Sequence, residues 1–223
     1  MAVLTPALAG EQGVQGTASR TAARERASEL FGKAAISCLF VILAISIGTE
    51  FLRTGHLTGL LLLVSELLVV LLTVMRRPAH VIDRSVAARV FSAISIVGVP
   101  LIRPAGAALA PDLITAAASG IGLLIVIAGK LTLGRSFGLL PANRGIVSRG
   151  VYQALRHPIY AGYLVTHVAF LVAHPTAWNL VMLVTADTAL MIRAVYEERT
   201  LARDPEYADY MARVRWRVCP GLF

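Results

Sequence analysis

Long apolar segments constrain the fold of this chain more than any other feature of its sequence. Charged residues make up only 15% of its 223 residues, whereas soluble domains average about 25%. A helix needs about 17–25 mostly apolar residues to cross a bilayer. The sequence therefore predicts an all-α, polytopic membrane bundle of about five to six transmembrane helices. The apolar segments cover roughly residues 34–52, 57–75, 86–103, 113–133, 159–174 and 176–192.

These segments differ in how clearly they predict a complete crossing. The first, second and fourth are long enough to span the hydrocarbon core. The third contains Pro100 near its end, and proline ends or kinks a helix. The last two are short and are separated only by the turn sequence AHPTA. We expect them to form a helical hairpin, and the sequence leaves open whether this hairpin crosses fully.

The positions of the basic residues predict how the chain is oriented. Lys and Arg accumulate in cytosolic loops of membrane proteins. If the N-terminus is cytosolic, only Arg53 and Arg103 of the 21 Lys and Arg residues fall on the opposite side. We therefore expect a multi-pass integral membrane protein with both termini and its site in the cytosol. The same asymmetry explains the net charge of +8 without a nucleic-acid partner.

Composition divides the chain into three regions. Residues 1–30 are rich in small and polar types, which is typical of a disordered or amphipathic segment. Residues 31–133 contain transmembrane helices 1 to 4. Residues 134–223 combine a polar loop, the hairpin and a charged tail that predicts a C-terminal cytosolic helix. Two polar segments that flank one hairpin can build a site at the membrane surface.

The stretch RGVYQALRHPIYAGYLV places polar side chains at the start of an apolar helix. Pro158 suits the first helical position, where its missing N–H costs nothing, so we expect His157 at the N-cap. Tyr160, Tyr163 and His167 then share one helical face. The alternative is that the tyrosines form an interfacial aromatic belt.

The charged tail carries a second group of candidates. Arg193 and Glu197 are four residues apart, and Glu198 is adjacent. Asp187 precedes Glu198 by about three helical turns, which places both acids on one face. The alternative is an ordinary solvated helix with a surface salt bridge worth under about 1 kcal/mol.

Two motif regions together carry a family resemblance. The segment GIVSRGVYQALRHPIYAGYLV, followed by EERTL and YADYMARVRWRVCPGLF, resembles the isoprenylcysteine carboxyl methyltransferase family. The related phospholipid methyltransferases share the R-H-P-x-Y pattern. The resemblance covers residues 134–223 and implies a cytosolic pocket for S-adenosylmethionine. The cofactor-binding positions that it implies are Arg144, Gly145, Ile146, Val147, Tyr152, His157, Pro158, Ile159, Tyr160 and Glu197.

The resemblance also implies roles in catalysis and in binding a lipophilic acceptor from the bilayer. Arg193 would contact the carboxylate of the acceptor, with Tyr163 and His167 beside it. A carboxylate is already ionised at pH 7 and needs no base, whereas an amine or phenol would need deprotonation by His157 or Glu198. We expect no metal. Residues 134–141 either cover the cofactor or form an ordinary turn.

Other functions stay open at this stage. The acceptor could be a phospholipid amine or another isoprenoid or aromatic molecule. A membrane reductase that uses NADPH is a further alternative, although the acids of the tail would repel phosphates. The last is a scaffold or transporter in which Glu66, His167 and Asp187 form a polar path.

Two polar residues inside the apolar segments add separate expectations. An acid within a membrane span is a functional candidate by default. Glu66 would either pair with His167 or line an entrance for the acceptor from the lipid, and a purely structural pair between helices is equally open. Lys130 and Glu50 lie near segment ends and would extend toward the interface.

Overall fold

The computed structural model describes residues 57–83, 85–103 and 105–223, with isolated positions between residues 30 and 52. The expectations for residues 1–30 and Glu50, and most of the apolar segment 34–52, lie outside these described residues. The fold is mostly helical. Its helices are α2 (Leu57–Met75), α3 (Val86–Val97), α4 (Asp112–Leu133), α5 (Pro158–Ala173), α6 (Ala177–Leu201) and α7 (Pro205–Arg213).

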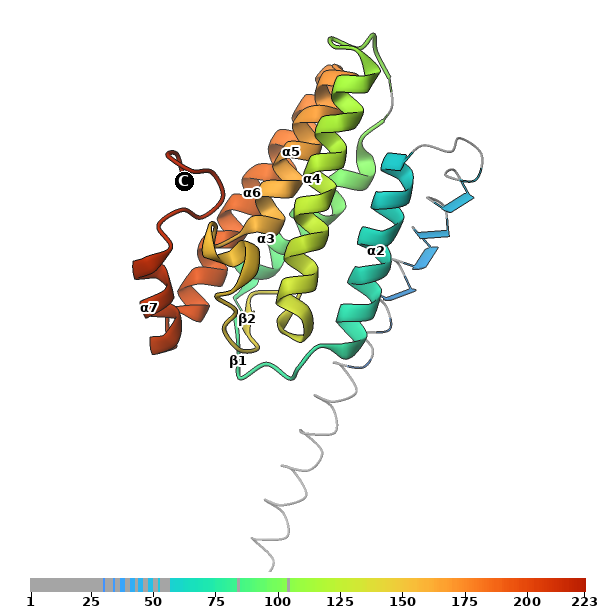
Figure 1. The fold of residues 1–223 in the computed structure, drawn as a ribbon. Helices are drawn as coiled ribbons and strands as arrows, with labels where there is room; N and C mark the ends of the chain where they lie inside the picture. Colours follow the sequence, from blue (N-terminus) through green and yellow to red (C-terminus); the bar gives the residue numbers. More distant parts are fainter. Residues whose placement is uncertain are drawn as a thin grey trace, which may run out of the picture.

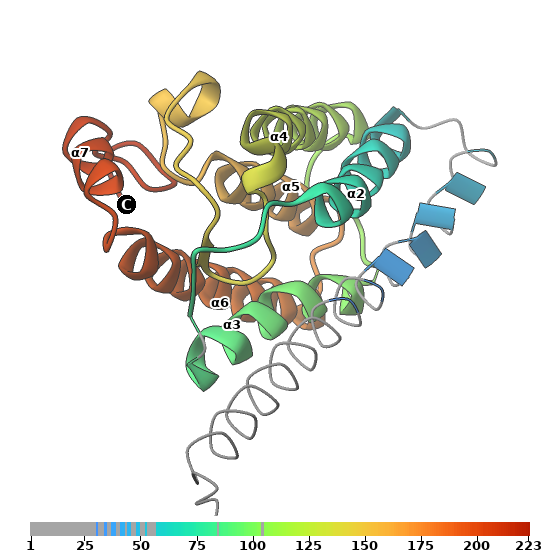
Figure 2. The ribbon, with the colours of Figure 1, turned by 90° about the horizontal axis from the view of Figure 1, so that it is seen from below.

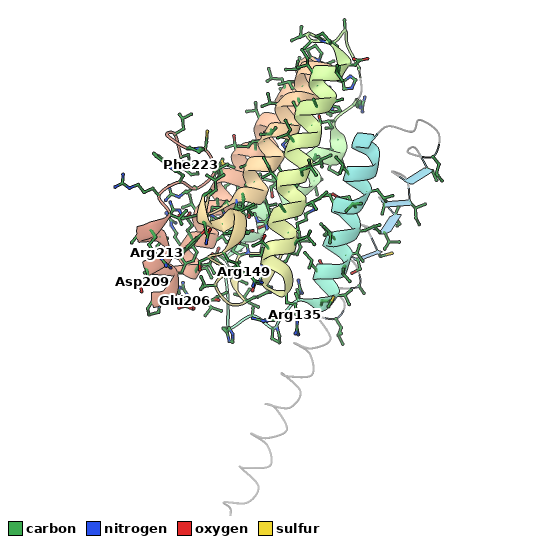
Figure 3. All side chains as sticks on the ribbon, in the orientation of Figure 1. Arg135, Arg149, Glu206, Asp209, Arg213 and Phe223 are labelled. Atoms are coloured by element: carbon green, nitrogen blue, oxygen red, sulfur yellow. The ribbon has the colours of Figure 1, made fainter. Side chains whose placement is uncertain are left out.

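The long helices lie side by side in one bundle (Figure 1). Within it, α4 packs against both α2 and α5, and α3 packs against α6. Figure 2 shows the bundle from below, with α7 beside the end of α6. The charged residues labelled in Figure 3, which include Arg135, Arg149 and Arg213, lie toward the end of the bundle that carries α7.

Two helices in the described part of the chain are long and apolar enough to cross a membrane. They span Asp112–Ser136 and Ala177–Leu201. Only 28% and 39% of their most apolar windows are buried inside the protein, so most of this apolar surface faces outward. Contiguous exposed apolar surface is costly in water and natural in lipid. This pattern supports membrane association, in agreement with the sequence.

The third apolar segment is shorter in the structure than the sequence suggests. The helix α3 has 12 residues, about 18 Å at 1.5 Å per residue, against a hydrocarbon core of about 30 Å. A 3-10 turn, Val99–Leu101, follows it with Pro100 at its start. As an α-helix, this segment does not have the length to span.

The last apolar segment is longer than expected. The turn AHPTA separates α5 from α6, and Thr176 caps α6 by accepting a hydrogen bond from the Asn179 amide (3.1 Å). However, α6 continues past residue 192 to Leu201 over 25 residues, about 37 Å. No Gly or Pro interrupts it, so the charged residues of the tail extend the helix. Arg193, Glu197 and Glu198 therefore stand on the same helix as the apolar span.

Glycines allow α4 and α5 to approach closely. A Cβ atom placed on Gly122 would lie 2.8 Å from the Gly162 carbonyl oxygen, and one on Gly162 would lie 2.6 Å from the Gly122 carbonyl oxygen. Gly129 faces Ile159 in the same way, at 2.6 Å. Small residues let membrane helices approach closely, and the helices then gain packing contacts although no hydrophobic effect drives them together. This interface fixes α5 on α4.

A two-residue antiparallel ladder is the one departure from an all-helical fold among the described residues. It pairs β1 (Val81–Ile82) with β2 (Ala142–Asn143). The Arg77 amide also donates to the Arg135 carbonyl (2.8 Å). The connection between α2 and α3 thereby holds the loop after α4 in place, and this loop forms one wall of the candidate site.

Candidate active site

A cavity of about 90 Å³ opens between the loop after α4, the start of α5, the end of α6 and α7. Its wall is mixed, with aromatic rings, arginines and one carboxylate. The residues used below that line it are Phe137, Gly138, Arg144, Gly145, Ile146, Val147, Tyr152, Arg156, His157, Ile159, Tyr160, Tyr163, Arg193, Glu197, Tyr207 and Tyr210.

The loop wall is shaped by local hydrogen bonds and one glycine. Gly145 has φ of +100°, a conformation that L side chains rarely adopt. Its amide donates to the Asn143 side-chain oxygen (2.9 Å), and Ser136 Oγ donates to the Arg144 carbonyl (3.1 Å). Asn143 also donates to Asp204, the N-cap of α7 (2.9 Å). Residues 134–141 thus form more than a turn, because four of them line the cavity.

The start of α5 agrees with the sequence prediction. The helix begins at Pro158 with His157 at its N-cap. This placement directs His157 and Tyr160 toward α6, and their rings stack at 5.0 Å between centroids. Both residues are buried.

Tyr160 connects α5 to the two candidate residues of α6. Its hydroxyl donates to Glu197 Oε2 at 2.6 Å, and the Arg193 guanidinium lies 5.5 Å from its ring centroid. No ion pair between Arg193 and Glu197 occurs in the described part of the chain. The expected alternative of a solvated surface pair is therefore wrong for these two residues, since each contacts Tyr160 at the cavity.

Arg193 is a buried cation with unused hydrogen-bonding capacity. The residue is 6% exposed, and its Nη2 donates to the Gly138 carbonyl (3.2 Å). Its buried Nε has no hydrogen-bond partner among the described residues. A buried, unpaired charge is costly, so this geometry suits an anionic ligand in the cavity.

Glu198 is held by three basic side chains and does not line the cavity. Its carboxylate lies 3.1 Å from His157 Nε2, 3.4 Å from Arg156 Nε and 2.8 Å from Arg217 Nε. The backbone amides of Arg156 and His157 donate to the Trp216 and Arg217 carbonyls. Glu198 therefore fastens the C-terminal segment to the start of α5. The structure gives it a structural position, and its role as a base stays a prediction.

Three tyrosines form the aromatic wall nearest α7. The Tyr210 hydroxyl donates to the Tyr152 carbonyl at 2.7 Å. Burial raises the pKa of the Tyr210 phenol to about 12, and burial also raises the pKa of Tyr152 and Tyr207 well above the usual range. All three phenols are therefore neutral at physiological pH, and all three residues line the cavity.

The predicted residues that do not line the cavity are Pro158, His167 and Glu198. Pro158 lies buried at the start of α5. His167 Nδ1 lies 2.6 Å from Asp187 Oδ1, and its ring stacks on Tyr163 at 6.2 Å. The proposed Glu66–His167 pair is wrong, because the partner of His167 is Asp187 on α6. The other predicted cofactor and acceptor residues all line the cavity, and their roles stay predictions.

Several cavity residues had no assigned role in the sequence. They include Tyr207 and Tyr210. The spacing of Tyr207 and Tyr210, three residues apart on a short amphipathic helix, is a signal for one shared face. Arg156 directly precedes His157, but its contact with Glu198 depends on the tertiary path of α6 and leaves no local signal.

Comparison with known families agrees with this geometry. Residues 113–204 match the family model described as phospholipid methyltransferase. The matched region runs from α4 through the cavity loop and α5 to the end of α6. This match supports the resemblance to membrane methyltransferases that the sequence indicated. No curated relative matches the sequence.

Proposed function

We propose that this protein is an S-adenosylmethionine-dependent methyltransferase for a lipophilic acceptor, most like a protein-S-isoprenylcysteine carboxyl O-methyltransferase. The observation that carries the proposal is the contact set of Tyr160, Glu197 and Arg193 in one cavity at the charged end of the bundle. We place this end, and both termini, in the cytosol. There a polar cofactor can arrive from water and a lipophilic acceptor from the bilayer.

The cavity residues fit the cofactor chemically. S-adenosylmethionine supplies an electrophilic methyl group on a sulfonium when it is bound. Glu197 accepts one hydrogen bond from Tyr160, which orients its carboxylate and leaves capacity for a charge-assisted bond to an ammonium. The neutral ring of Tyr152 lines the cavity and can attract a cation, whereas the Tyr160 ring already contacts His157 and Arg193. The loop from Arg144 to Val147 lines the same cavity.

The geometry favours a carboxylate as the methyl acceptor. Arg193 can hold such a group through its unpartnered Nε. A carboxylate needs no base, whereas an amine or phenol does. The two candidate bases, His157 and Glu198, are bound to each other, and Arg156 and Arg217 hold Glu198 as well. Methyl transfer then depends mainly on how the cavity aligns the reactants.

A reductase that uses NADPH is the second candidate, because one observation favours it. Arg144, Arg156 and Arg193 all line the cavity, and clustered arginines suit phosphate groups. Arg156 is already engaged with Glu198, and Glu197 would repel a phosphate. The family match also favours methyl transfer.

Calorimetric titration of the detergent-purified protein separates these two functions. S-adenosylhomocysteine and NADPH would each be titrated into the folded wild-type chain. We expect micromolar binding of S-adenosylhomocysteine and no binding of NADPH. The reverse result would replace the methyltransferase with the reductase, and binding of neither would reject both.

A further inference from the structure

Lys130 lies deep between helices rather than extending to the interface as the sequence suggested. Its side chain is fully buried on α4. The ammonium donates to Ser65 Oγ at 2.7 Å and to the Ser65 carbonyl at 3.0 Å across the contact with α2. Burying an ammonium among membrane helices is costly, and such residues usually serve a function. The cofactor contacts described above do not use Lys130.

Tyr163 connects this buried lysine to the cavity. Lys130 Nζ lies 5.7 Å from the centroid of the Tyr163 ring, within the range of a cation–π interaction. Tyr163 is half-buried and lines the cavity. The positive charge of Lys130 is therefore separated from the cavity by a single aromatic ring.

Two further charged residues lie in this part of the bundle. Arg193 lines the cavity together with Tyr163. Glu66 is buried on α2 directly after Ser65, which accepts both hydrogen bonds from Lys130. Lys130 and Arg193 are thus the cations on the two sides of the acceptor wall.

We propose that Lys130 is a positioning and specificity-determining residue, which through Tyr163 makes the acceptor side of the cavity selective for an anionic headgroup on an apolar chain. Lys130 holds the Tyr163 ring in place and adds positive potential that Arg193 reinforces. The inference rests on the proposed methyltransferase function and adds the acceptor's charge and the residues that select it.

The expected effect follows from the distances involved. A unit charge about one helix diameter away, roughly 10 Å, changes the affinity for an anion roughly tenfold at an effective dielectric constant of about 20. The affinity for a neutral ligand of the same shape would hardly change. Charge selectivity therefore separates an electrostatic role of Lys130 from a purely structural one.

The test is a titration of two matched probes in the presence of S-adenosylhomocysteine. The probes are N-acetyl-S-farnesylcysteine, which carries a carboxylate, and its neutral primary amide. They are titrated into the wild type, Lys130→Met and the charge-conserving Lys130→Arg. We expect the carboxylate to bind roughly tenfold more weakly to Lys130→Met and to keep its advantage over the amide in Lys130→Arg. The amide should change by less than about twofold in Lys130→Met.

A loss confined to the carboxylate cannot come from a general loss of structure. If Lys130→Met does not fold, the preference of the wild type for the carboxylate over the amide still carries the test. Equal changes for the carboxylate and the amide, or no preference for the carboxylate in the wild type, would overturn the inference while S-adenosylhomocysteine still binds. Loss of S-adenosylhomocysteine binding by the folded wild type would instead reject the proposed function, and the inference with it.

Discussion

The two sides of α5 are built in opposite ways. Toward α4, the helix packs backbone against backbone, because Gly162 meets Gly122 and Ile159 covers Gly129. Toward α6, its next neighbour in the chain, the backbones approach at few positions. There, polar side chains bridge the two helices, as in the pairs Tyr160–Glu197 and His167–Asp187.

The difference shows how this bundle can hold a site inside an apolar protein. Close glycine packing on one side fixes the position of α5 through backbone contacts rather than through hydrogen-bonded side chains. The other side is then free to carry charged and aromatic residues around a cavity. A site needs rigid support to keep its geometry, and here one helix supplies both the support and the site. The predictions below test each side in turn.

The largest expected effect on stability comes from the polar side. Glu198→Ala would leave the largely buried Arg156 guanidinium and the buried His157 ring without their carboxylate partner, and Arg217 without its ion pair. Removing one partner of a buried charge network costs about 3 kcal/mol. We expect the free energy of unfolding to fall by this amount, measured by denaturant titration in mixed micelles.

The control is Glu206→Ala, at an exposed position of α7 (Figure 3), and its free energy of unfolding should change little. A loss below about 1 kcal/mol would show that the polar side contributes no more than a surface pair.

The contact between α4 and α5 should lose stability when a single methyl group is added to it. Gly162→Ala would place a Cβ atom 2.6 Å from the Gly122 carbonyl oxygen, so the two helices would have to separate. Overpacking of this kind costs about 2 kcal/mol. The same unfolding measurement checks it. Gly120→Ala is the matched control on α4, because its nearest neighbour outside the local backbone is 4.0 Å away. Equal stability of the two variants would contradict close packing between α4 and α5.

The smallest effect is expected at the aromatic wall beside α7. Tyr210→Phe removes the hydrogen bond to the Tyr152 carbonyl, which should cost about 1 kcal/mol. The pKa of Tyr210 is raised in the folded state to about 12, above the usual value of about 10. The contribution of the phenol is therefore fully present below about pH 10 and is lost as pH rises toward 12. The difference in unfolding temperature between wild type and Tyr210→Phe should be constant from pH 7 to about pH 9. A difference that declines within this range would contradict the assignment.

Local signals predicted the features that depend on neighbouring residues. The start of α5 at Pro158 follows from the conformational limits of proline alone. The turn between α5 and α6 follows from its sequence as well. The apolar segment was expected to end near residue 192, and the helical spacing of Asp187 and Glu198 already assumed that the helix continues beyond it. The residues after Met191 include the strong helix formers Arg, Ala, Glu and Leu, and the helix continues until Leu201.

Features that depend on contacts between distant residues could not be predicted in the same way. Lys130 was expected to extend to the interface, yet Ser65 on another helix holds it inside. The partner of His167 is Asp187 rather than Glu66, which depends on how α5 and α6 are rotated. Most of the predicted cofactor residues meet at one cavity because the family pattern already contains that long-range information.

The most direct test of the central claim is the affinity of S-adenosylhomocysteine for the wild type and for Glu197→Gln, measured by calorimetry. The substitution keeps the size of the side chain and removes the charge that Tyr160 orients toward the cavity. We predict micromolar binding to the wild type and roughly 30-fold weaker binding to Glu197→Gln, about 2 kcal/mol, with Glu206→Gln unchanged. Equal affinity of the wild type and Glu197→Gln would contradict a cofactor site between α5 and α6.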